Sequence, residues 1–437
     1  MDEFRLQKTG STGPQTELLQ LGLTRAGHEL KKDGVFGPLT RSAVVSFQRR
    51  AGLEPDGVAG PLTWAALRPY LTGYVRHTVR RGDTMYDLAL RYGVRASAIE
   101  IANPGVDPRA MQIGSELTIP LPFTVVPGDI CFTSLVMALC AEGLCARYPF
   151  LRLAEAGHSV LGRPIFCLAA GTGGRQIFYN GTHHANEWIT APLTARFLEE
   201  YAAAYAEGTT VEGLDVREAW KRVTLFVAPL VDPDGADLVT GEIASGGAYT
   251  SASSIAAEYP EIPFPNGWKA NISGTDLNLQ YPAGWEEARE IKFAQGFRCP
   301  APRDFVGTAP LSAPESRGIY TLTREHDFAL TISYHTQGRV IYWKYGDREP
   351  DGARALAERF ALLSGYSVED VPYASGFAGY KDWFIDAYDR PGFTIEAGQG
   401  TPPLPLSSFP AMYAENRRIM AAGVAWAAGI EQDISDS

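Results

Sequence analysis

The sequence has few cysteines, and they predict no covalent cross-links. Its 437 residues contain five cysteines, an odd number whose spacing matches neither a disulfide framework nor a zinc finger or ribbon. Three of them, Cys131, Cys140 and Cys145, lie among Leu, Val, Met and Ala, which is typical of small buried side chains. Cys299, before Pro300, is the best placed of the five to act as a nucleophile.

Long hydrophobic runs and excess positive charge are also absent. No apolar run reaches the roughly 18 residues that span a bilayer, and residues 1–8 lack the apolar core of a signal peptide. The formal net charge of −11 at pH 7 argues against non-specific binding of nucleic acid. We expect no membrane span and no nucleic-acid partner. Retention in the cell, export by another route and a missing leader all remain open.

What the sequence does have is ordinary globular composition, with 45% hydrophobic and 20% charged residues. Its length allows about two to four domains. An internal repeat marks the first domain: Asp33–Thr40 returns as Asp56–Thr63, with Asp-Gly and Gly-Pro turns before a helix-like segment. We expect Thr40 and Thr63 to be helix N-caps. With a helix over residues 17–23, the repeat predicts a small three-helix module.

A second small module follows over residues 74–121. A strand-like alternation at residues 77–80 leads to a Gly-Asp turn and an amphipathic helix from Met85, with Thr84 as its N-cap and Gly93 as its end. A second short helix and a closing strand at residues 113–120 complete a βααβ pattern. A Pro/Gly linker comes next.

The remaining 300 or so residues predict one large α/β domain. Short apolar runs end at Asn180, Pro229, Tyr334 and Glu396, and helix-like segments alternate with them. Such alternation predicts a mostly parallel sheet. Polar residues directly after such strands are where ligands bind.

Candidate metal ligands follow two of these strands. The chain has seven histidines and a single His-x-x-Glu, His184 to Glu187, while His335 directly follows Tyr334. Two histidines and one carboxylate, with an open fourth position, form a common catalytic zinc shell. Glu396, at the end of another apolar strand, is a candidate general base. The His-x-x-Glu spacing alone also arises by chance in many chains.

The two small modules resemble known wall-binding domains. Asp33-Gly34-x-x-Gly37-x-x-Thr40 with Ala43-x-x-x-Phe47-Gln48 is similar to the peptidoglycan-binding domain of cell-wall hydrolases. Val79-x-x-Gly82-Asp83-Thr84, Ile101–Pro104 and Gly114-x-x-Leu117-x-Ile119-Pro120 resemble a LysM domain. The resemblance implies peptidoglycan glycan as a partner.

The large domain resembles the carboxypeptidase A-like zinc peptidases. The resemblance rests on Asn180-Gly181-x-His183-His184-Ala185-Asn186-Glu187, Pro233-Asp234-Gly235, Gly274-x-Asp276-Leu277-Asn278, Tyr334–Gly338 and Thr394–Glu396. It implies a mixed, mostly parallel sheet of eight strands and one zinc ion per chain, held by His184, Glu187 and His335. His183 precedes the motif and is not expected to be a ligand.

The resemblance also implies roles for five other residues. Glu396 matches the catalytic glutamate, and Lys269 lies where the family has an arginine that polarises the carbonyl. Asn278 matches an asparagine that contacts the substrate carboxylate, and Tyr373 approximately matches a mobile tyrosine. Lys381 lies where the family sets its preference for the leaving residue, where a cation would suit diaminopimelate. A solvated surface lysine is the alternative for Lys381.

One departure from the family bears on the reaction. Exocarboxypeptidases have an arginine after the Asn278 position, and this chain has Leu279, which cannot clamp a terminal carboxylate. The whole architecture resembles bacterial γ-D-glutamyl-diaminopimelate endopeptidases. Because some members of that group act in sporulating cells, the resemblance implies sporulation as one setting for this chain. We expect a peptidoglycan-binding domain at 5–72, a LysM domain at 74–122 and a catalytic domain at 125–432, acting on peptidoglycan stem peptides.

Three alternatives remain at this point. A zinc D,L-carboxypeptidase of the same fold would trim a terminal diaminopimelate. A non-catalytic wall-binding protein would keep the modules and lack hydrolysis. A papain-like cysteine peptidase would need a nucleophilic thiol, for which no cysteine here has a suitable sequence context.

Overall fold

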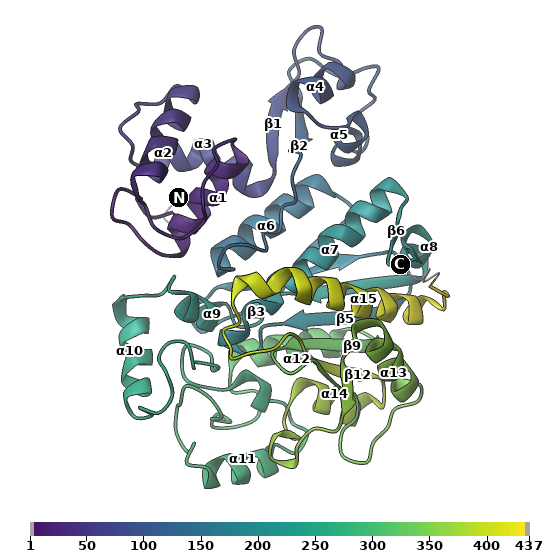
Figure 1. Ribbon diagram of the computed structural model, residues 1–437. Coiled ribbons are helices and arrows are strands. Elements are labelled where there is room, and N and C mark those ends of the chain that lie inside the picture. The colour runs from purple at the N-terminus through teal and green to yellow at the C-terminus, as the bar shows by residue number, and fades with distance from the viewer. Residues whose placement is uncertain (1–3, 433–437) are drawn as a thin grey trace. The chain divides into compact units, whose positions relative to one another are not determined.

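The computed structural model describes residues 4–432. The chain divides into two compact units, which Figure 1 shows in one view. The first unit comprises the residues up to Cys131 together with Leu135–Arg152. The second comprises Phe132–Ser134 and the residues from Leu153 onward.

The first unit begins with three helices, α1 (Pro14–Arg25), α2 (Pro38–Arg50) and α3 (Pro61–Thr72). Each copy of the sequence repeat forms the same set of hydrogen bonds, which join one helix to the turn before the next helix. Gln20 Nε2 donates to Asp33 Oδ1 (2.8 Å) and Val35 O (3.1 Å), while its Oε1 accepts from Gly34 N (3.0 Å). Gln48 makes the same three bonds with Asp56, Val58 and Gly57. A buried amide thus holds each Asp-Gly turn.

The prediction that Thr40 and Thr63 are the N-caps of two of these helices is wrong. The N-caps of α2 and α3 are Gly37 and Gly60, each followed by proline at the first helical position. Thr40 lies inside the first turn, where its hydroxyl accepts from Gln20 Nε2 (3.2 Å). The glutamine network uses this hydroxyl, so it is not available as a cap, and Thr63 is bound to Gln48 in the same way.

The second small domain has the βααβ order that the sequence predicts. Strands β1 (Tyr74–Thr78) and β2 (Glu116–Pro120) pair in antiparallel fashion, and α4 (Met85–Tyr92) and α5 (Ala96–Ala102) lie between them in the chain. Thr84 caps α4 by accepting from Asp87 N, and Gly93 ends it in the left-handed region. Helix α6 (Ser134–Arg147) joins this unit from Leu135 onward.

The second unit is built on an eight-stranded sheet of order β11-β10-β12-β9-β5-β8-β4-β3. Its central strands β8, β5, β9 and β12 are parallel neighbours, which confirms the predicted mixed, mostly parallel sheet. The strands are β3 (Arg152–His158), β4 (Pro164–Ala170), β5 (Arg175–Gly181), β8 (Val223–Ala228), β9 (Phe328–His335), β10 (Val340–Tyr342), β11 (Ser367–Glu369) and β12 (Gly392–Glu396). A small hairpin joins β6 (Thr210–Val211) to β7 (Leu214–Asp215).

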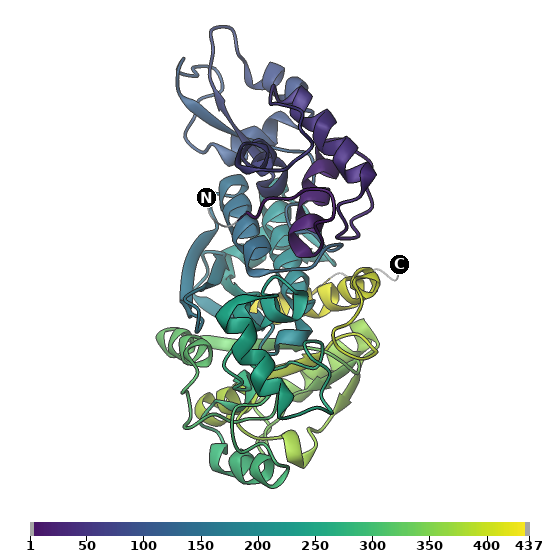
Figure 2. The same ribbon diagram turned by 90° about the vertical axis from the view of Figure 1, so that its left-hand side faces the viewer.

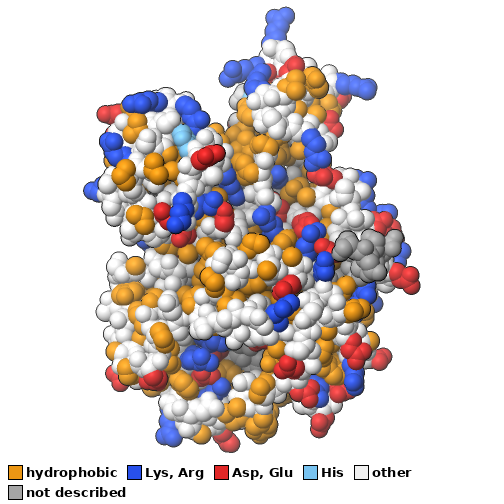
Figure 3. Space-filling model, viewed as in Figure 1, with side chains coloured by type: hydrophobic (Ala, Val, Ile, Leu, Met, Phe, Trp, Pro, Cys, Tyr) orange, Lys and Arg blue, Asp and Glu red, His pale blue; other side chains and the backbone are white. Residues whose placement is uncertain are grey.

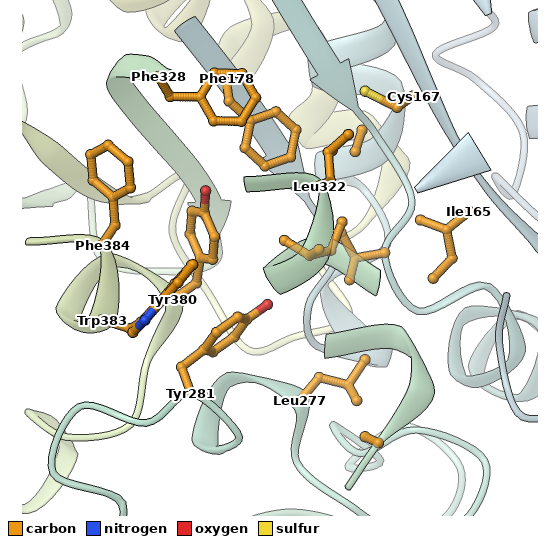
Figure 4. Packing of buried hydrophobic residues seen from close by; sticks show 14 of the residues in the cluster. Ile165, Cys167, Phe178, Leu277, Tyr281, Leu322, Phe328, Tyr380, Trp383 and Phe384 are labelled. Atoms are coloured by element: carbon orange, nitrogen blue, oxygen red, sulfur yellow. The ribbon is translucent and has the colours of Figure 1, made fainter. Parts of the chain in front are cut away.

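Alternating residues of β5 bury opposite faces of this sheet. Tyr179 faces α7 (Thr190–Glu207) and α15 (Phe409–Ala428), where its hydroxyl donates to Met420 O (2.8 Å). Phe178 faces the other side and stacks on Phe328. Figure 4 shows Phe178 and Phe328 in one cluster with Tyr380 and Trp383 from α14 (Tyr380–Tyr388) and Leu322 from α12 (Pro314–Glu325).

A long stretch between β8 and β9 contains no strand and supplies one wall of the site described below. It holds α9 (Pro233–Thr240), α10 (Gly246–Ala257), α11 (Trp285–Ala294) and the short 3₁₀ helix Leu277–Leu279. Figure 2 turns this stretch, drawn in teal and green, toward the viewer. The remaining elements are α8 (Val216–Arg222), α13 (Ala353–Ser364) and the 3₁₀ helices Ala185–Glu187, Tyr373–Ser375 and Leu406–Ser408.

Arg163 compensates two buried carboxylates beside the sheet, and its loss should destabilise this unit. Asp234 and Asp237 are both inaccessible to solvent, and they lie 2.6 and 3.2 Å from Arg163 Nη1 and Nε. Burial raises the pKa of Asp237 to about 6, against the opposing effect of Arg163. We expect Arg163→Met to lower the free energy of unfolding by about 3 kcal/mol at pH 7, because it leaves buried charges uncompensated.

The loss should be smaller at pH 5, because protonation of Asp237 then removes its uncompensated charge. Urea denaturation followed by tryptophan fluorescence measures the effect, since all tryptophans except Trp64 lie in this unit. Arg354→Met is the matched control, because the Arg354–Glu358 pair is exposed and should contribute less than about 1 kcal/mol. Equal losses in the two variants would contradict the prediction.

Candidate metal centre

Three side chains converge where two parallel strands end. His184 follows β5 and precedes the 3₁₀ helix that carries Glu187, while His335 is the last residue of β9. His184 Nδ1 and His335 Nδ1 each lie 3.0 Å from one Glu187 oxygen and 3.2 Å from each other. Within residues 4–432, this is the one group of three or more His, Cys, Asp or Glu side chains whose ligand atoms all lie within 4.8 Å of one another.

The hydrogen bonds around this group fit a metal ion. His184 Nε2 lies 3.2 Å from Asp276 Oδ1, so its Nδ1 is the nitrogen directed at Glu187. Carboxylate partners of this kind orient metal-binding histidines. Burial raises the pKa of Asp276, but the neighbouring His184 and Lys269 outweigh it and hold this pKa below its usual value. Two ring nitrogens and one carboxylate match the protein ligands of catalytic zinc.

His183 is not part of the group. Its Nε2 lies 2.9 Å from the Tyr281 hydroxyl, and Figure 4 shows Tyr281 in the core cluster. Burial holds the pKa of His183 well below its usual value, so this ring is neutral at pH 7. The sequence predicts only that His183 is not a ligand, and in the structure its ring contacts Tyr281 of the core.

Glu396 lies beside the triad because of strand register. It ends β12 directly opposite His335 of the parallel strand β9. Burial raises the pKa of Glu396, and the nearby Glu187 raises it further. Lys269 and His184 lower this pKa but do not outweigh the other two effects, so the pKa of Glu396 is raised to about 8. A cation held by the triad would lower this pKa again. Glu396 is thus a buried carboxylate that is not itself one of the three clustered ligands.

Lys269 brings a positive charge to the same place. Its Nζ lies 2.9 Å from Glu187 Oε1. The backbone holds its segment against the triad, because Ala185 N donates to Lys269 O (3.0 Å). Burial lowers the pKa of Lys269, but Glu187 outweighs this and raises it overall. The ammonium is therefore charged at pH 7.

A cavity of about 230 Å³ opens over these groups. Six of the eight residues predicted from the sequence line it: His184, Lys269, Asn278, His335, Lys381 and Glu396. Glu187 lies buried behind the two histidines. Tyr373 is 70% exposed and does not line the cavity, although Ser375 of the same 3₁₀ helix does.

Two of the lining residues are already engaged by their neighbours. Asn278 Oδ1 accepts from Tyr380 N (3.0 Å). The Lys381 ammonium is buried, is paired with Asp382 and donates to Lys344 O (2.6 Å). Lys381 is therefore a neutralised cation in the wall, which excludes the alternative of a solvated surface lysine.

The cavity also contains charged residues that the sequence analysis missed. They are Lys292, Arg303, Asp304 and Asp382, together with Asp276, which appeared only as part of a motif. Residues 300–304 reach the site because Pro302 O accepts from both Lys269 N (2.7 Å) and Ala270 N (2.9 Å). No periodicity marks this irregular segment, so only the Arg-Asp pair itself could have drawn attention to it.

Three known families match successive parts of the chain. The zinc carboxypeptidase family matches residues 139–401, the peptidoglycan binding domain residues 12–67 and the LysM domain residues 77–120. A gamma-D-glutamyl-L-diamino acid endopeptidase 1 of Lysinibacillus sphaericus is 43% identical over 63% of this chain and 68% of its own length. YqgT of Bacillus subtilis (strain 168), an uncharacterized protein, is 37% identical over 61% and 70%.

Solved structures share the fold of the large unit at low sequence identity. Thrombin-activatable fibrinolysis inhibitor gives a TM-score of 0.54 at 18% identity, over 69% of this chain and 78% of that one. Carboxypeptidase A from Helicoverpa armigera gives 0.52 at 17%, over 90% and 88%. Within residues 4–432, no helix is long and apolar enough to cross a membrane.

Proposed function

Because the chain belongs to the zinc carboxypeptidase family, we propose that it hydrolyses the bond between the D-glutamate γ-carboxyl and meso-diaminopimelate in peptidoglycan stem peptides. The observation that carries the proposal is the cavity in which Glu396 and Lys269 adjoin the triad of His184, Glu187 and His335. The sequence relative named for γ-D-glutamyl-L-diamino acid cleavage supports the choice of bond.

In this proposal the triad holds one zinc ion per chain. Zinc in such a site polarises a carbonyl and acidifies a water molecule. Glu396 accepts a proton from the attacking water and passes it to the leaving amine. Its position at the end of β12, opposite His335, supports this role. Lys269 stabilises the negative charge that develops on the scissile carbonyl oxygen.

Leu279 supports an endopeptidase over a strict carboxypeptidase. It lines the cavity beside Asn278, where an exopeptidase needs a cation to hold the terminal carboxylate of its substrate. An apolar side chain at this position leaves room for a substrate that continues beyond the scissile bond. Asn278 would contact the leaving residue through its amide.

The Lys381–Asp382 pair fits diaminopimelate better than a lone cation would. Both side chains are buried, and both line the cavity. The distal end of diaminopimelate carries an ammonium and a carboxylate. The positive Lys381 and the negative Asp382 together can bind both groups. A substrate side chain that carried only a carboxylate would be repelled by Asp382.

The small domains indicate peptidoglycan as the binding partner. They contribute no residue to the metal centre, which is built entirely within the second unit. Their proposed role is to hold the enzyme on glycan and raise its effective concentration near stem peptides. Removing both domains should therefore slow the digestion of intact peptidoglycan far more than that of a soluble peptide.

Digestion of defined peptides tests the proposal. The full chain is incubated with L-Ala-γ-D-Glu-meso-diaminopimelate and with the tetrapeptide extended by D-Ala, and products are followed by mass spectrometry. Release of L-Ala-D-Glu from both substrates, abolished by a chelator and restored by zinc, is expected. Release of L-Ala-D-Glu from the tripeptide but not from the tetrapeptide, or release of D-Ala alone from the tetrapeptide, would favour a carboxypeptidase. No cleavage by zinc-loaded protein would favour the non-catalytic alternative.

A further inference from the structure

The cavity contains one cation that shares its nearest carboxylate with a second cation. Four basic side chains line the cavity: Lys269, Lys292, Arg303 and Lys381. Each lysine has a carboxylate partner, which is Glu187 for Lys269, Asp304 for Lys292 and Asp382 for Lys381. Arg303 shares Asp304 with Lys292, so this trio carries a net positive charge.

Arg303 is the more exposed of the two cations that share Asp304. Lys292 Nζ lies 2.6 Å from Asp304 Oδ1, and Arg303 Nε lies 2.6 Å from Asp304 Oδ2. The Lys292 side chain is 8% exposed and that of Arg303 is 43% exposed. Within residues 4–432, Arg303 donates a hydrogen bond through Nε alone. Its two terminal nitrogens are therefore free, and they form the fork that binds a carboxylate with two parallel hydrogen bonds.

Backbone hydrogen bonds on both sides of Arg303 fix where its segment lies. Arg303 follows Pro302, whose carbonyl accepts from Lys269 N, and precedes Asp304, whose amide donates to Asp276 Oδ2 (3.1 Å). Asp276 in turn binds His184. Arg303 is thus joined on one side to the Lys269 segment and on the other to the metal centre.

The other paired cation belongs to a different part of the wall. Lys381 lies on α14, next to Tyr380, whose amide donates to Asn278 Oδ1. In the proposed reaction Asn278 and Lys381 adjoin the leaving diaminopimelate, and Lys269 adjoins the scissile carbonyl. Arg303, which neighbours Lys269, therefore adjoins the acyl part of the substrate.

We propose that Arg303 binds the α-carboxylate of the D-glutamyl residue and thereby selects γ-linked substrates whose α-carboxyl is free. This inference rests on the proposed function. In a γ-glutamyl bond three carbon atoms separate the free α-carboxylate from the scissile carbonyl. In an α-linked peptide the α-carboxyl is itself the scissile carbonyl, so a residue without an acidic side chain has no carboxylate to offer the Arg303 fork. Amidation of this carboxyl to D-isoglutamine removes the charge that the Arg303 fork recognises.

The test compares two peptides that differ only in this group. L-Ala-γ-D-Glu-meso-diaminopimelate and its α-carboxamide are digested by the wild-type chain and by Arg303→Gln, and kcat/KM is measured for each. We expect the wild type to prefer the free carboxylate by about 10- to 100-fold, the range of a hydrogen bond to a charged group. Arg303→Gln should lose this preference because its kcat/KM falls for the carboxylate substrate and stays the same for the carboxamide.

Two further variants separate recognition from structural damage. Arg303→Lys should recover part of the preference, because it restores the charge without the fork. Arg317→Gln, which removes an exposed arginine of the same unit, should behave like the wild type. Equal loss on both substrates in Arg303→Gln, or a wild type that cleaves both equally, would overturn the assignment. A wild type that cleaves neither peptide would instead contradict the proposed function, and the assignment with it.

Discussion

Replacement of Glu396 by glutamine is expected to reduce kcat for the γ-D-glutamyl bond by about 10²- to 10⁴-fold, the usual contribution of a positioned general base. The change keeps the size and shape of the side chain but removes its ability to accept a proton. Glu396 lines the cavity and lies opposite His335 across neighbouring strands, yet it is not one of the three clustered ligands. Zinc content should therefore stay near one per chain.

Steady-state hydrolysis of the tripeptide and metal analysis of the same samples measure the two quantities. Glu358→Gln is the matched control, because Glu358 lies on the exposed face of α13 and pairs with the exposed Arg354. A Glu396→Gln variant that loses its zinc together with its activity would show that Glu396 holds the metal. Full activity in this variant would exclude Glu396 as the base.

The position of the metal centre follows from rules that can be applied to the sequence. Glu396, His335 and the His184 motif each follow an apolar strand, and the carboxyl ends of parallel strands meet at one edge of a sheet. The structure places β12, β9 and β5 side by side in that order. Local patterns placed each candidate at a strand end, but it was the resemblance to the zinc peptidases that joined residues more than 200 positions apart in the chain into one site.

The charge balance of the cavity could not be obtained in the same way. Arg303 reaches the cavity through a backbone contact between two irregular segments, Pro302 with Lys269, and no sequence period encodes such a contact. Lys381 was expected to be a free cation, but the rotamers of Lys381 and Asp382 bring adjacent residues into an ion pair. Thr40 failed as a cap for a related reason, because a distant glutamine uses its hydroxyl.

Replacement of Lys269 by methionine is expected to lower kcat by about 10²- to 10³-fold, the usual effect of losing one donor to a developing oxyanion. Methionine keeps most of the apolar stem, so the packing against the metal centre should survive. Lys269→Arg should retain much of the activity, because it keeps the charge that the cavity places beside Glu187. A guanidinium can also make two parallel hydrogen bonds to the polarised group.

The alternative role for Lys269 is to anchor Glu187, and zinc affinity separates the two. The ammonium lies 2.9 Å from Glu187 Oε1 and so competes with any cation for this carboxylate. If Lys269 acts on the substrate, Lys269→Met should bind zinc at least as tightly as the wild type while kcat falls and KM changes little. If Lys269 only positions Glu187, zinc affinity should fall in the methionine variant, and added zinc should restore the rate. Lys221→Met, at an exposed site on α8, should change neither quantity.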